Sequence, residues 1–317
     1  MEAAAPLAGS RFNGAAEVML RESTRIAAVL VLVLLGGVIV ALLEGSLPAL
    51  RAFGAGFLFN ESWNPVTENF GAAGPIYGTL VTSAIAMALA IPVSLGVAIF
   101  ITELCPAWLK RPIGTAIELL AGIPSIIYGV WGLFVLAPIL QHHVQPWLIA
   151  TFENVPGLAT LFAGPPYGIG VLTAAIILSV MVLPFITSVA RDVFETVPPM
   201  LKESAYGLGA TTWEVVRHVV IPYTRTGLVG AVMLGLGRAL GETMAVTFVI
   251  GNAHRIGTSL LSPGTTISAS IANEFTEADS ALYTSALIEL GLILFAITFI
   301  VLACARLMLR RLDRRRA

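Results

Sequence analysis

The sequence predicts an all-α membrane protein with six transmembrane helices and both termini in the cytoplasm. Of its 317 residues, 57% are hydrophobic and only 12% are charged, and the mean hydropathy is +0.88. Because soluble domains carry about 25% charged residues, this composition excludes a cytosolic enzyme, a secreted disulfide scaffold and a nucleic-acid-binding protein. Cys105 and Cys304 have no metal-binding spacing, and we expect His142, His143 and His254 to be solvated, so no metal site is predicted.

Six apolar segments are each long enough to cross ~30 Å of hydrocarbon at about 1.5 Å per helical residue. The first, 26–43, contains no charged residue, and we expect a retained anchor helix and not a cleaved signal peptide. The others are 75–102, 113–138, 168–190, 226–251 and 281–305. Pro92, Pro124 and Pro184 lie in the second, third and fourth segments, whose helices we expect them to bend.

The distribution of basic residues predicts the orientation. Fifteen of the 18 Lys and Arg residues fall on one side of this plan, and only Arg51 and Arg255 fall on the other. The positive-inside rule makes the first side cytoplasmic. We therefore expect a cytoplasmic tail (1–25), a transmembrane domain (26–309) and a basic cytoplasmic tail (310–317). Acidic residues in the outer loops form either a docking surface or solvated connections: Glu44, Glu61, Glu68, Glu153, Glu274, Glu277 and Asp279.

The longest basic connection, 191–225, has the sequence of two short helices. Pro198 and Pro199 begin the first helix, and Gly209 stands where a left-handed residue would end it. Thr211 has the capping-box spacing to Glu214 at the start of the second helix, which we expect Pro222 to end. A rigid elbow of this kind can transmit the movement of a bound partner to membrane helices.

Four ionisable residues, Glu118, Arg238, Glu242 and Glu289, fall within predicted spans, where each costs about 3 kcal/mol. Arg238 and Glu242 are four residues apart and would share a helical face. Either Arg238 meets a passing anion and Glu242 holds the guanidinium between passages, or the two form a structural ion pair. For Glu118 and Glu289 we favour structural hydrogen bonding.

Small residues recur at four-residue steps in the fifth predicted span, at Gly227, Ala231, Gly235 and Ala239. Such a stripe permits close contact between membrane helices. Since the same segment carries two charges, we expect it to pack inside a bundle or an interface and not to face lipid on all sides.

The basic connection resembles the EAA loop of ABC-importer permeases. Glu203, Ala205, Gly209 and Pro222 match the spacing of that pattern, and Ser204 replaces its first Ala. The resemblance implies that this segment docks on an ATPase subunit. The chain contains no G-x-x-x-x-G-K-[ST] phosphate loop, so we expect no catalytic residues here and ATP hydrolysis on another chain.

Two further stretches, IPSIIYGVWGLF (123–134) and GRALGETMAV (237–246), resemble the PstC family of permease subunits from bacterial phosphate-specific ABC importers. The resemblance covers nearly the whole chain. It implies a type I importer (MetI-like) permease in the bacterial inner membrane that moves inorganic phosphate by alternating access. In this family Arg238 and Glu242 would belong to the translocation path, and Glu203 and Gly209 to the coupling loop.

The same resemblance implies the partners: the sister permease PstA, two copies of the ATPase PstB, and the periplasmic phosphate-binding protein PstS. ATP and magnesium would bind to the ATPase, and no cofactor would bind to this chain.

Two alternatives stay open at this point. The chain could be an ABC permease for another oxyanion or a phosphonate, because an arginine does not distinguish phosphate from sulfate. It could also be a proton-coupled carrier that uses Glu118, Glu242 and Glu289 as a relay. The elbow argues against the second alternative, because such a carrier needs no docking segment.

Overall fold

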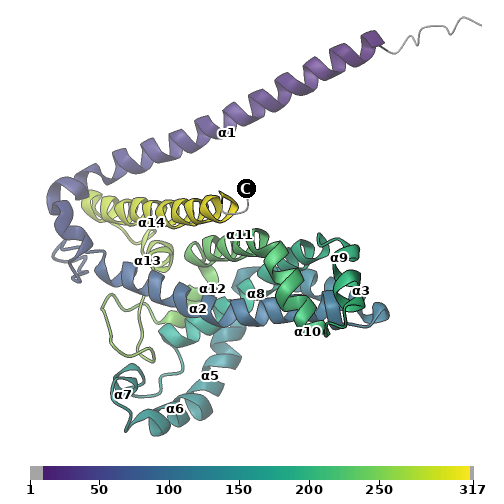
Figure 1. The fold of residues 1–317 in the computed structure, drawn as a ribbon. Helices are drawn as coiled ribbons and strands as arrows, with labels where there is room; N and C mark the ends of the chain where they lie inside the picture. Colours follow the sequence, from purple (N-terminus) through teal and green to yellow (C-terminus); the bar gives the residue numbers. More distant parts are fainter. Residues whose placement is uncertain (1–9, 315–317) are drawn as a thin grey trace, which may run out of the picture.

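The computed structural model describes residues 10–314, with side chains from 16 to 307, and the chain is built from helices (Figure 1). The predicted all-α class is confirmed, and six helical segments are long and apolar enough to cross a membrane: Ala16–Leu58, Ala73–Leu104, Ser125–Phe152, Val171–Glu195, Thr212–Leu240 and Ala281–Leu307. Residues 1–9 and 315–317, which belong to the predicted tails, lie outside the described residues. Residues 10–25 of the predicted first tail continue the first helix.

The helices are α1 (Ser10–Phe53), α2 (Ala73–Ile99), α3 (Ala107–Ala121), α4 (Ser125–Trp131), α5 (Ala137–Ile139), α6 (Gln145–Phe152), α7 (Leu158–Leu161), α8 (Val171–Glu195), α9 (Pro199–Gly207), α10 (Thr212–Val215), α11 (Ile221–Leu240), α12 (Met244–Ile250), α13 (Ile267–Glu274) and α14 (Ala281–Arg314). A 3-10 helix, η1 (Gly54–Leu58), follows α1. Four π-helical turns adjoin other helices: η2 (Phe100–Leu104), η3 (Gly132–Leu136), η4 (Leu140–Val144) and η5 (Val216–Val220).

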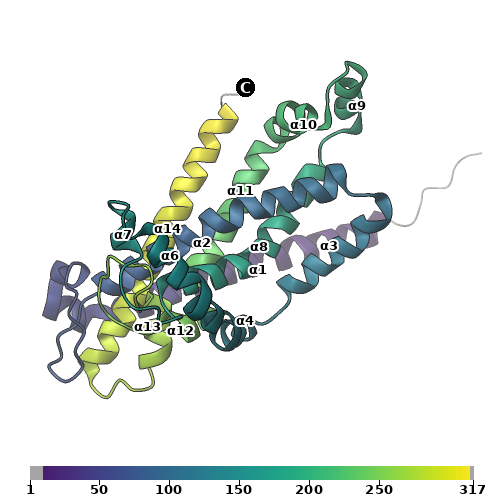
Figure 2. The ribbon, with the colours of Figure 1, turned by 90° about the horizontal axis from the view of Figure 1, so that it is seen from below.

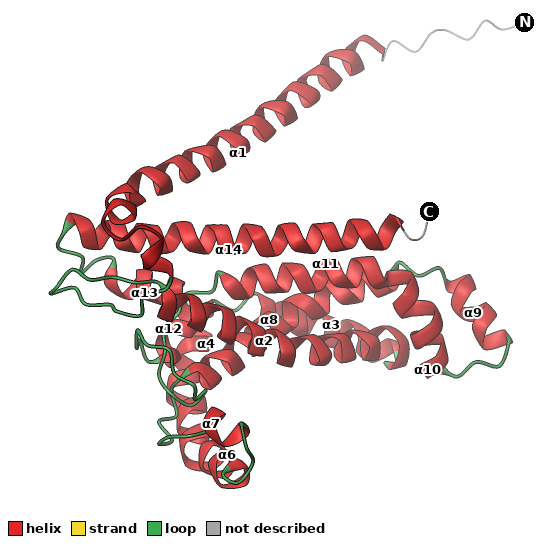
Figure 3. Cartoon of the chain, turned by 60° about the vertical axis from the view of Figure 1, so that its left-hand side comes forward, coloured by secondary structure: helices red, strands yellow, loops and turns green. Residues whose placement is uncertain are grey.

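The bundle centres on α2 and α8, which pack side by side, with α11 and α3 against α8 and α14 beside α1. Figure 2 shows α9 and α10 projecting from the end of the bundle where α3 begins. In Figure 3 the start of α1, the end of α14 and the α9–α10 segment lie at one end of the molecule, and α6, α7 and α13 lie at the other. The basic segments thus share one end, as the predicted orientation requires.

Two predicted spans are interrupted in the structure. The third was expected to be one helix over 113–138, but α3 ends at Ala121 and Pro124 caps the start of α4. Proline disfavours a helical residue before it, so Ile123 leaves the helix. The fifth was expected over 226–251, but α11 ends at Leu240 and α12 begins at Met244. Pro92 and Pro184 lie inside α2 and α8.

Pro222 does not end the second elbow helix, contrary to the prediction. The helix continues from α10 through η5 into α11, and Pro222 lies in the first turn of α11. The π-helical turn explains this result, because the amide of Ile221 bonds to the carbonyl of Val216 and the turn is wider there. The helix therefore continues past Pro222 but changes direction there, and α10 and α11 point different ways (Figure 3).

The small-residue stripe of α11 packs closely against α8, as predicted. A Cβ added at Gly227 would lie 2.6 Å from Val193, and one at Gly235 would lie 2.6 Å from Ile186. Ala231 of the same stripe is fully buried. These close approaches hold α11 on α8. Arg238 follows Ala231 by seven residues and lies on the same side of α11, with its guanidinium near Phe185 of α8.

Candidate translocation and coupling sites

Arg238 lies near the end of α11 on an exposed face of the chain. Its guanidinium carbon is 5.9 Å from the centre of the Phe185 ring in α8, a cation–π distance. Tyr128 of α4 lies within reach of its charge, and the Tyr128 hydroxyl donates a hydrogen bond of 2.8 Å to the carbonyl of Leu120. The arginine therefore stands where α4, α8 and α11 meet.

Glu242 does not share a helical face with Arg238, because α11 ends two residues before it. Its Oε1 accepts a hydrogen bond of 3.3 Å from the amide of Ala245 and so caps the start of α12. No ion pair joins Arg238 to Glu242 within residues 16–307. The shared helical face that was predicted for the two residues is therefore wrong, because the helix breaks at Gly241, and the alternative of a structural ion pair is not formed in this conformation.

A broad apolar surface lies beside Arg238. The exposed residues of α4 and η3 are Ile126, Ile127, Val130, Trp131, Phe134 and Val135, and together they line a hollow. A second hollow connects this surface to Tyr128 and to Val180 of α8. Phe134 is 72% exposed, so the surface is uncovered in the single chain.

Glu118 lies in α3, a helix of 15 residues that is separate from the third candidate span, Ser125–Phe152. Its Oε1 lies 2.9 Å from Nη2 of Arg191 in α8, and the same guanidinium also contacts Asp192. The structural contact expected for this carboxylate is present, and it ties α3 to the end of α8.

Glu289 lies in α14 and is 3% exposed. Its Oε2 has no hydrogen-bond partner among the described residues, so the structural hydrogen bonding that we favoured is missing at that atom. Helix periodicity could not have shown this, because it gives the face on which a residue lies and not the groups that meet that face.

The elbow, residues 191–225, forms as predicted at the start of its first helix and at the turn between its two helices. Gly209 follows the C-cap of α9 with φ +86°, the left-handed conformation that ends a helix. The capping box at α10 is complete: the amide of Thr211 donates to Glu214 at 2.8 Å, and the amide of Glu214 donates to Thr211 at 3.4 Å. These bonds need no tertiary partner, which is why the local sequence predicts them.

The elbow presents an apolar surface to solvent. Met200, Leu208 and Trp213 are exposed, and Leu208 is 90% exposed. Glu203 and Ser204 are exposed beside them, and the Ser204 hydroxyl donates to the carbonyl of Met200. Ala205 packs against the core instead. Exposed apolar side chains on a helix that projects from the bundle are typical of a protein–protein contact.

Gly209→Ala should destabilise the end of α9 by about 1 kcal/mol, because an L-residue at positive φ is strained. A Cβ at Gly209 would meet nothing within 4 Å, so the cost is conformational and not steric. Gly207→Ala is the matched control. It lies inside α9, also has open space, and should stabilise the helix slightly. Hydrogen exchange of amides 201–210 measures both changes, and equal protection in the two variants would contradict the role of Gly209.

The outer end of the chain holds a buried carboxylate that the sequence did not reveal. Glu274 is 8% exposed, and it accepts hydrogen bonds of 2.6 Å from the Trp63 indole and the Tyr283 hydroxyl. His254 Nε2 lies 2.6 Å from its other oxygen, and the His254 ring stacks on Trp63 at 4.8 Å. Glu274 is therefore neither part of an exposed docking surface nor solvated, and the prediction that His254 is solvated is wrong.

Burial alone would raise the pKa of the Glu274 carboxyl, but the hydrogen bonds from His254, Tyr283 and Trp63 outweigh it and hold this pKa below its usual value. The carboxylate joins three segments: the loop after η1, the loop after α12, and α14. Sequence periodicity missed this site, since the three donors and Glu274 span residues 63 to 283 and share no local pattern.

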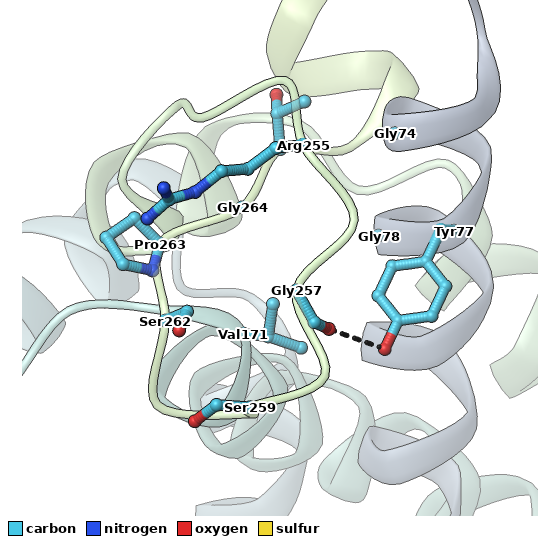
Figure 4. A pocket seen from close by; sticks show the side chains of 11 residues that line it. Gly74, Tyr77, Gly78, Val171, Arg255, Gly257, Ser259, Ser262, Pro263 and Gly264 are labelled. Atoms are coloured by element: carbon cyan, nitrogen blue, oxygen red, sulfur yellow. Dashed lines mark hydrogen bonds between the residues drawn. The ribbon is translucent and has the colours of Figure 1, made fainter. Parts of the chain in front are cut away.

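Figure 4 shows how the loop after α12 folds over the start of α2. The Tyr77 hydroxyl donates a hydrogen bond of 3.1 Å to the carbonyl of Gly257. A Cβ at Gly78 would overlap the carbonyl oxygen of Thr265, so the backbones touch. The pocket there, which Arg255 also lines, has a volume of about 10 Å³, room for one water and too small for an oxyanion.

Comparison with known proteins gives the family. Residues 90–317 match the family described as "binding-protein-dependent transport system inner membrane component". A phosphate transport system permease protein PstC from Mesorhizobium japonicum is 69% identical over 94% of this chain and 91% of the relative. The PstC protein of Pasteurella multocida is 57% identical over 94% of this chain and 93% of the relative.

Solved structures share the fold. A chain of the bacterial alginate ABC transporter has a TM-score of 0.60 at 18% identity, over 93% of this chain and 95% of its own length. A chain of the MetNI methionine ABC transporter has a TM-score of 0.54 at 18% identity, over 75% of this chain and 94% of its own length. The six-span helical architecture of an ABC-importer permease, predicted from the sequence, is thereby confirmed, and the chain belongs to the PstC family of inner-membrane permease proteins.

Proposed function

We propose that this chain is the permease subunit of an ATP-driven importer that moves inorganic phosphate through the inner membrane by alternating access. The observation that carries the proposal is Arg238, a cation at membrane depth on an open face between α4, α8 and α11. Relatives that carry the name phosphate transport system permease, at 69% and 57% identity, support phosphate as the substrate.

A second permease subunit, PstA in the family, covers the face that carries Arg238. An arginine facing hydrocarbon costs about 3 kcal/mol or more, so this face cannot be left to lipid. The neighbouring apolar surface of α4 and η3, with Trp131 and Phe134 exposed, offers the contact area for that subunit. Phosphate then passes between the two permeases, and Arg238 contacts it there.

Arg238 acts transiently in this proposal, because a permanent strong anion site would trap phosphate. A guanidinium offers paired donors to phosphate oxygens. Glu242 lies just beyond the end of α11, and its bond to the Ala245 amide is long at 3.3 Å. We propose that in the empty path its carboxylate leaves that amide and holds the guanidinium until the next anion arrives.

The other functions of the importer belong to its partner subunits. Two PstB ATPase subunits bind ATP and magnesium, and one of them docks on the elbow of this chain at Glu203, Ser204, Gly209 and the exposed apolar residues beside them. The binding protein PstS docks at the outer end, where α6, α7 and α13 lie (Figure 1). The Glu274 hydrogen bonds fix the outer loops that receive it.

Uptake of labelled phosphate by cells with and without this chain tests the proposal. We expect chain-dependent uptake to stop when ATP is depleted and to survive collapse of the proton gradient. The opposite dependence would favour a proton-coupled carrier. If no phosphate uptake depends on the chain, the substrate is a different oxyanion or a phosphonate, and competition with labelled sulfate and phosphonates identifies it.

A further inference from the structure

An ion pair joins the projecting helix α9 to the end of α2. Lys202 Nζ lies 2.5 Å from Glu103 Oε1, between residues 99 positions apart in the sequence. The side chain of Glu103 is 6% exposed and that of Lys202 is 20% exposed. An ion pair shielded from water in this way is stronger than an exposed one, because the surrounding dielectric is low.

Few other contacts hold α9 to the bundle. The helix contains no fully buried residue, and its apolar attachment passes through Ala205. Lys202 of α9 forms an ion pair with the end of a membrane helix, whereas the Ser204 hydroxyl bonds within α9. The exposed Met200 and Leu208 flank this inner contact. Lys202 therefore faces the chain's own bundle, while its neighbours are available to a partner.

The contacts at the end of α2 would transmit a movement of α9 to the centre of the bundle. Glu103 lies in η2, the π-helical turn that ends α2, and Lys110 donates a hydrogen bond of 2.8 Å to the carbonyl of Thr102 in the same turn. Further along, the hydroxyl of Ser94 in α2 donates to the carbonyl of Leu183 in α8 at 3.1 Å. A displacement of η2 therefore reaches the α2–α8 pair at the centre of the bundle.

We propose that Lys202 and Glu103 are positioning residues that pass the movement of the ATPase-docked elbow to α2. The chain between α8 and α9 already links the elbow to α8, and the ion pair adds the link to α2, so that both central helices move together. This inference rests on the proposed function, because it needs an ATPase that moves α9. Without the ion pair, α9 can rock on its flanking turns while α2 stays in place.

The test uses the whole importer reconstituted in lipid vesicles, with binding protein and ATP. For Lys202→Met we expect the ATPase to copurify and to hydrolyse ATP, while phosphate imported per ATP falls about tenfold. Glu103→Gln should give the same loss. Lys110→Met is the matched control. It removes the lysine of α3 that donates a hydrogen bond to the Thr102 carbonyl at the end of α2. Because this lysine contacts Thr102 and not α9, the variant should keep the wild-type ratio.

The exchanged pair, Lys202→Glu with Glu103→Lys, separates coupling from simple support of the fold. We expect it to restore phosphate imported per ATP to within about threefold of wild type. An unchanged ratio in both single variants, or loss of ATPase binding that the exchanged pair does not repair, overturns the inference. If the wild-type importer itself shows no ATP-dependent phosphate uptake, the proposed function fails instead, and the two failures are distinguishable.

Discussion

Arg238→Gln should reduce phosphate uptake by roughly 10- to 100-fold while the importer still assembles. Glutamine keeps a polar side chain of similar reach but loses the charge and the paired donors. Hydrogen bonds to charged groups contribute about 1.5–3 kcal/mol, and about 1.4 kcal/mol corresponds to tenfold in rate. The measurement is the initial rate of labelled phosphate uptake, together with copurification of the second permease and the ATPase.

Arg306→Gln is the matched control for that variant. Arg306 lies in the last part of α14, where it lines a hollow with Gly230 and Leu234 of α11 that Arg238 does not line. Its loss should leave uptake within about twofold of wild type. If Arg238→Gln abolishes copurification of the partners, its role is structural. Wild-type uptake by an assembled Arg238→Gln importer would remove the residue from the translocation path altogether.

Glu274→Gln should destabilise the outer end of the chain by about 3 kcal/mol, because it removes a buried charge that accepts three hydrogen bonds. The amide has one acceptor oxygen left, which can keep the bonds from Trp63 and Tyr283, and its NH₂ group then faces His254 Nε2 in place of the second carboxylate oxygen. Hydrogen exchange of the loops after η1 and α12 measures the loss. We expect protection there to fall about 100-fold, with α8 unchanged.

Glu277→Gln serves as the control on the same loop, since Glu277 is exposed. Its substitution should change protection by less than about 0.5 kcal/mol. Equal effects of the two variants would show that the loop responds to its net charge and not to the buried hydrogen bonds of Glu274.

The Glu274 contacts also predict a pH dependence. The pKa of this carboxyl is lower in the folded protein than its usual value, so the unfolded state binds the proton more tightly. The stabilisation is therefore fully present above about pH 4.3, the ordinary glutamate pKa, and is lost as pH falls through the lowered folded-state pKa. The protection difference between wild type and Glu274→Gln should shrink over that acidic range; a constant difference would contradict the assignment.

Local sequence signals predicted the features that depend on local bonds. The left-handed Gly209, the Thr211 capping box and the small-residue stripe of α11 all appear as expected, because each depends on spacing within a single helix or turn. The break at Pro124 was expected only as a bend, because apolar residues continue on both sides of it, and the break at Gly241 was missed although Arg238 and Glu242 flank it.

Contacts between segments that are distant in the sequence were also not predicted. Glu274 was expected on an outer loop, as part of a docking surface or of a solvated connection, and no periodicity indicates that Trp63 and Tyr283 converge on it. The ion pair of Lys202 with Glu103 joins two segments in the same way. In each case tertiary packing, and not propensity, decides which side chains meet.

The uninterrupted passage of the helix across Pro222 has a mechanical consequence. Residues Thr212–Leu240 form one helical segment of 29 residues that turns between α10 and α11 (Figure 3). The part that carries Arg238, α11, has 20 residues and is about 30 Å long at ~1.5 Å per residue. If the cytoplasmic end of α11 were the pivot, a tilt of roughly 10° would carry its far end, near Arg238, through about 5 Å, comparable to the ~4.6 Å backbone diameter of a helix. A small rotation at the ATPase can thus become a large opening at the arginine, with the π-helical turn near the pivot setting the angle.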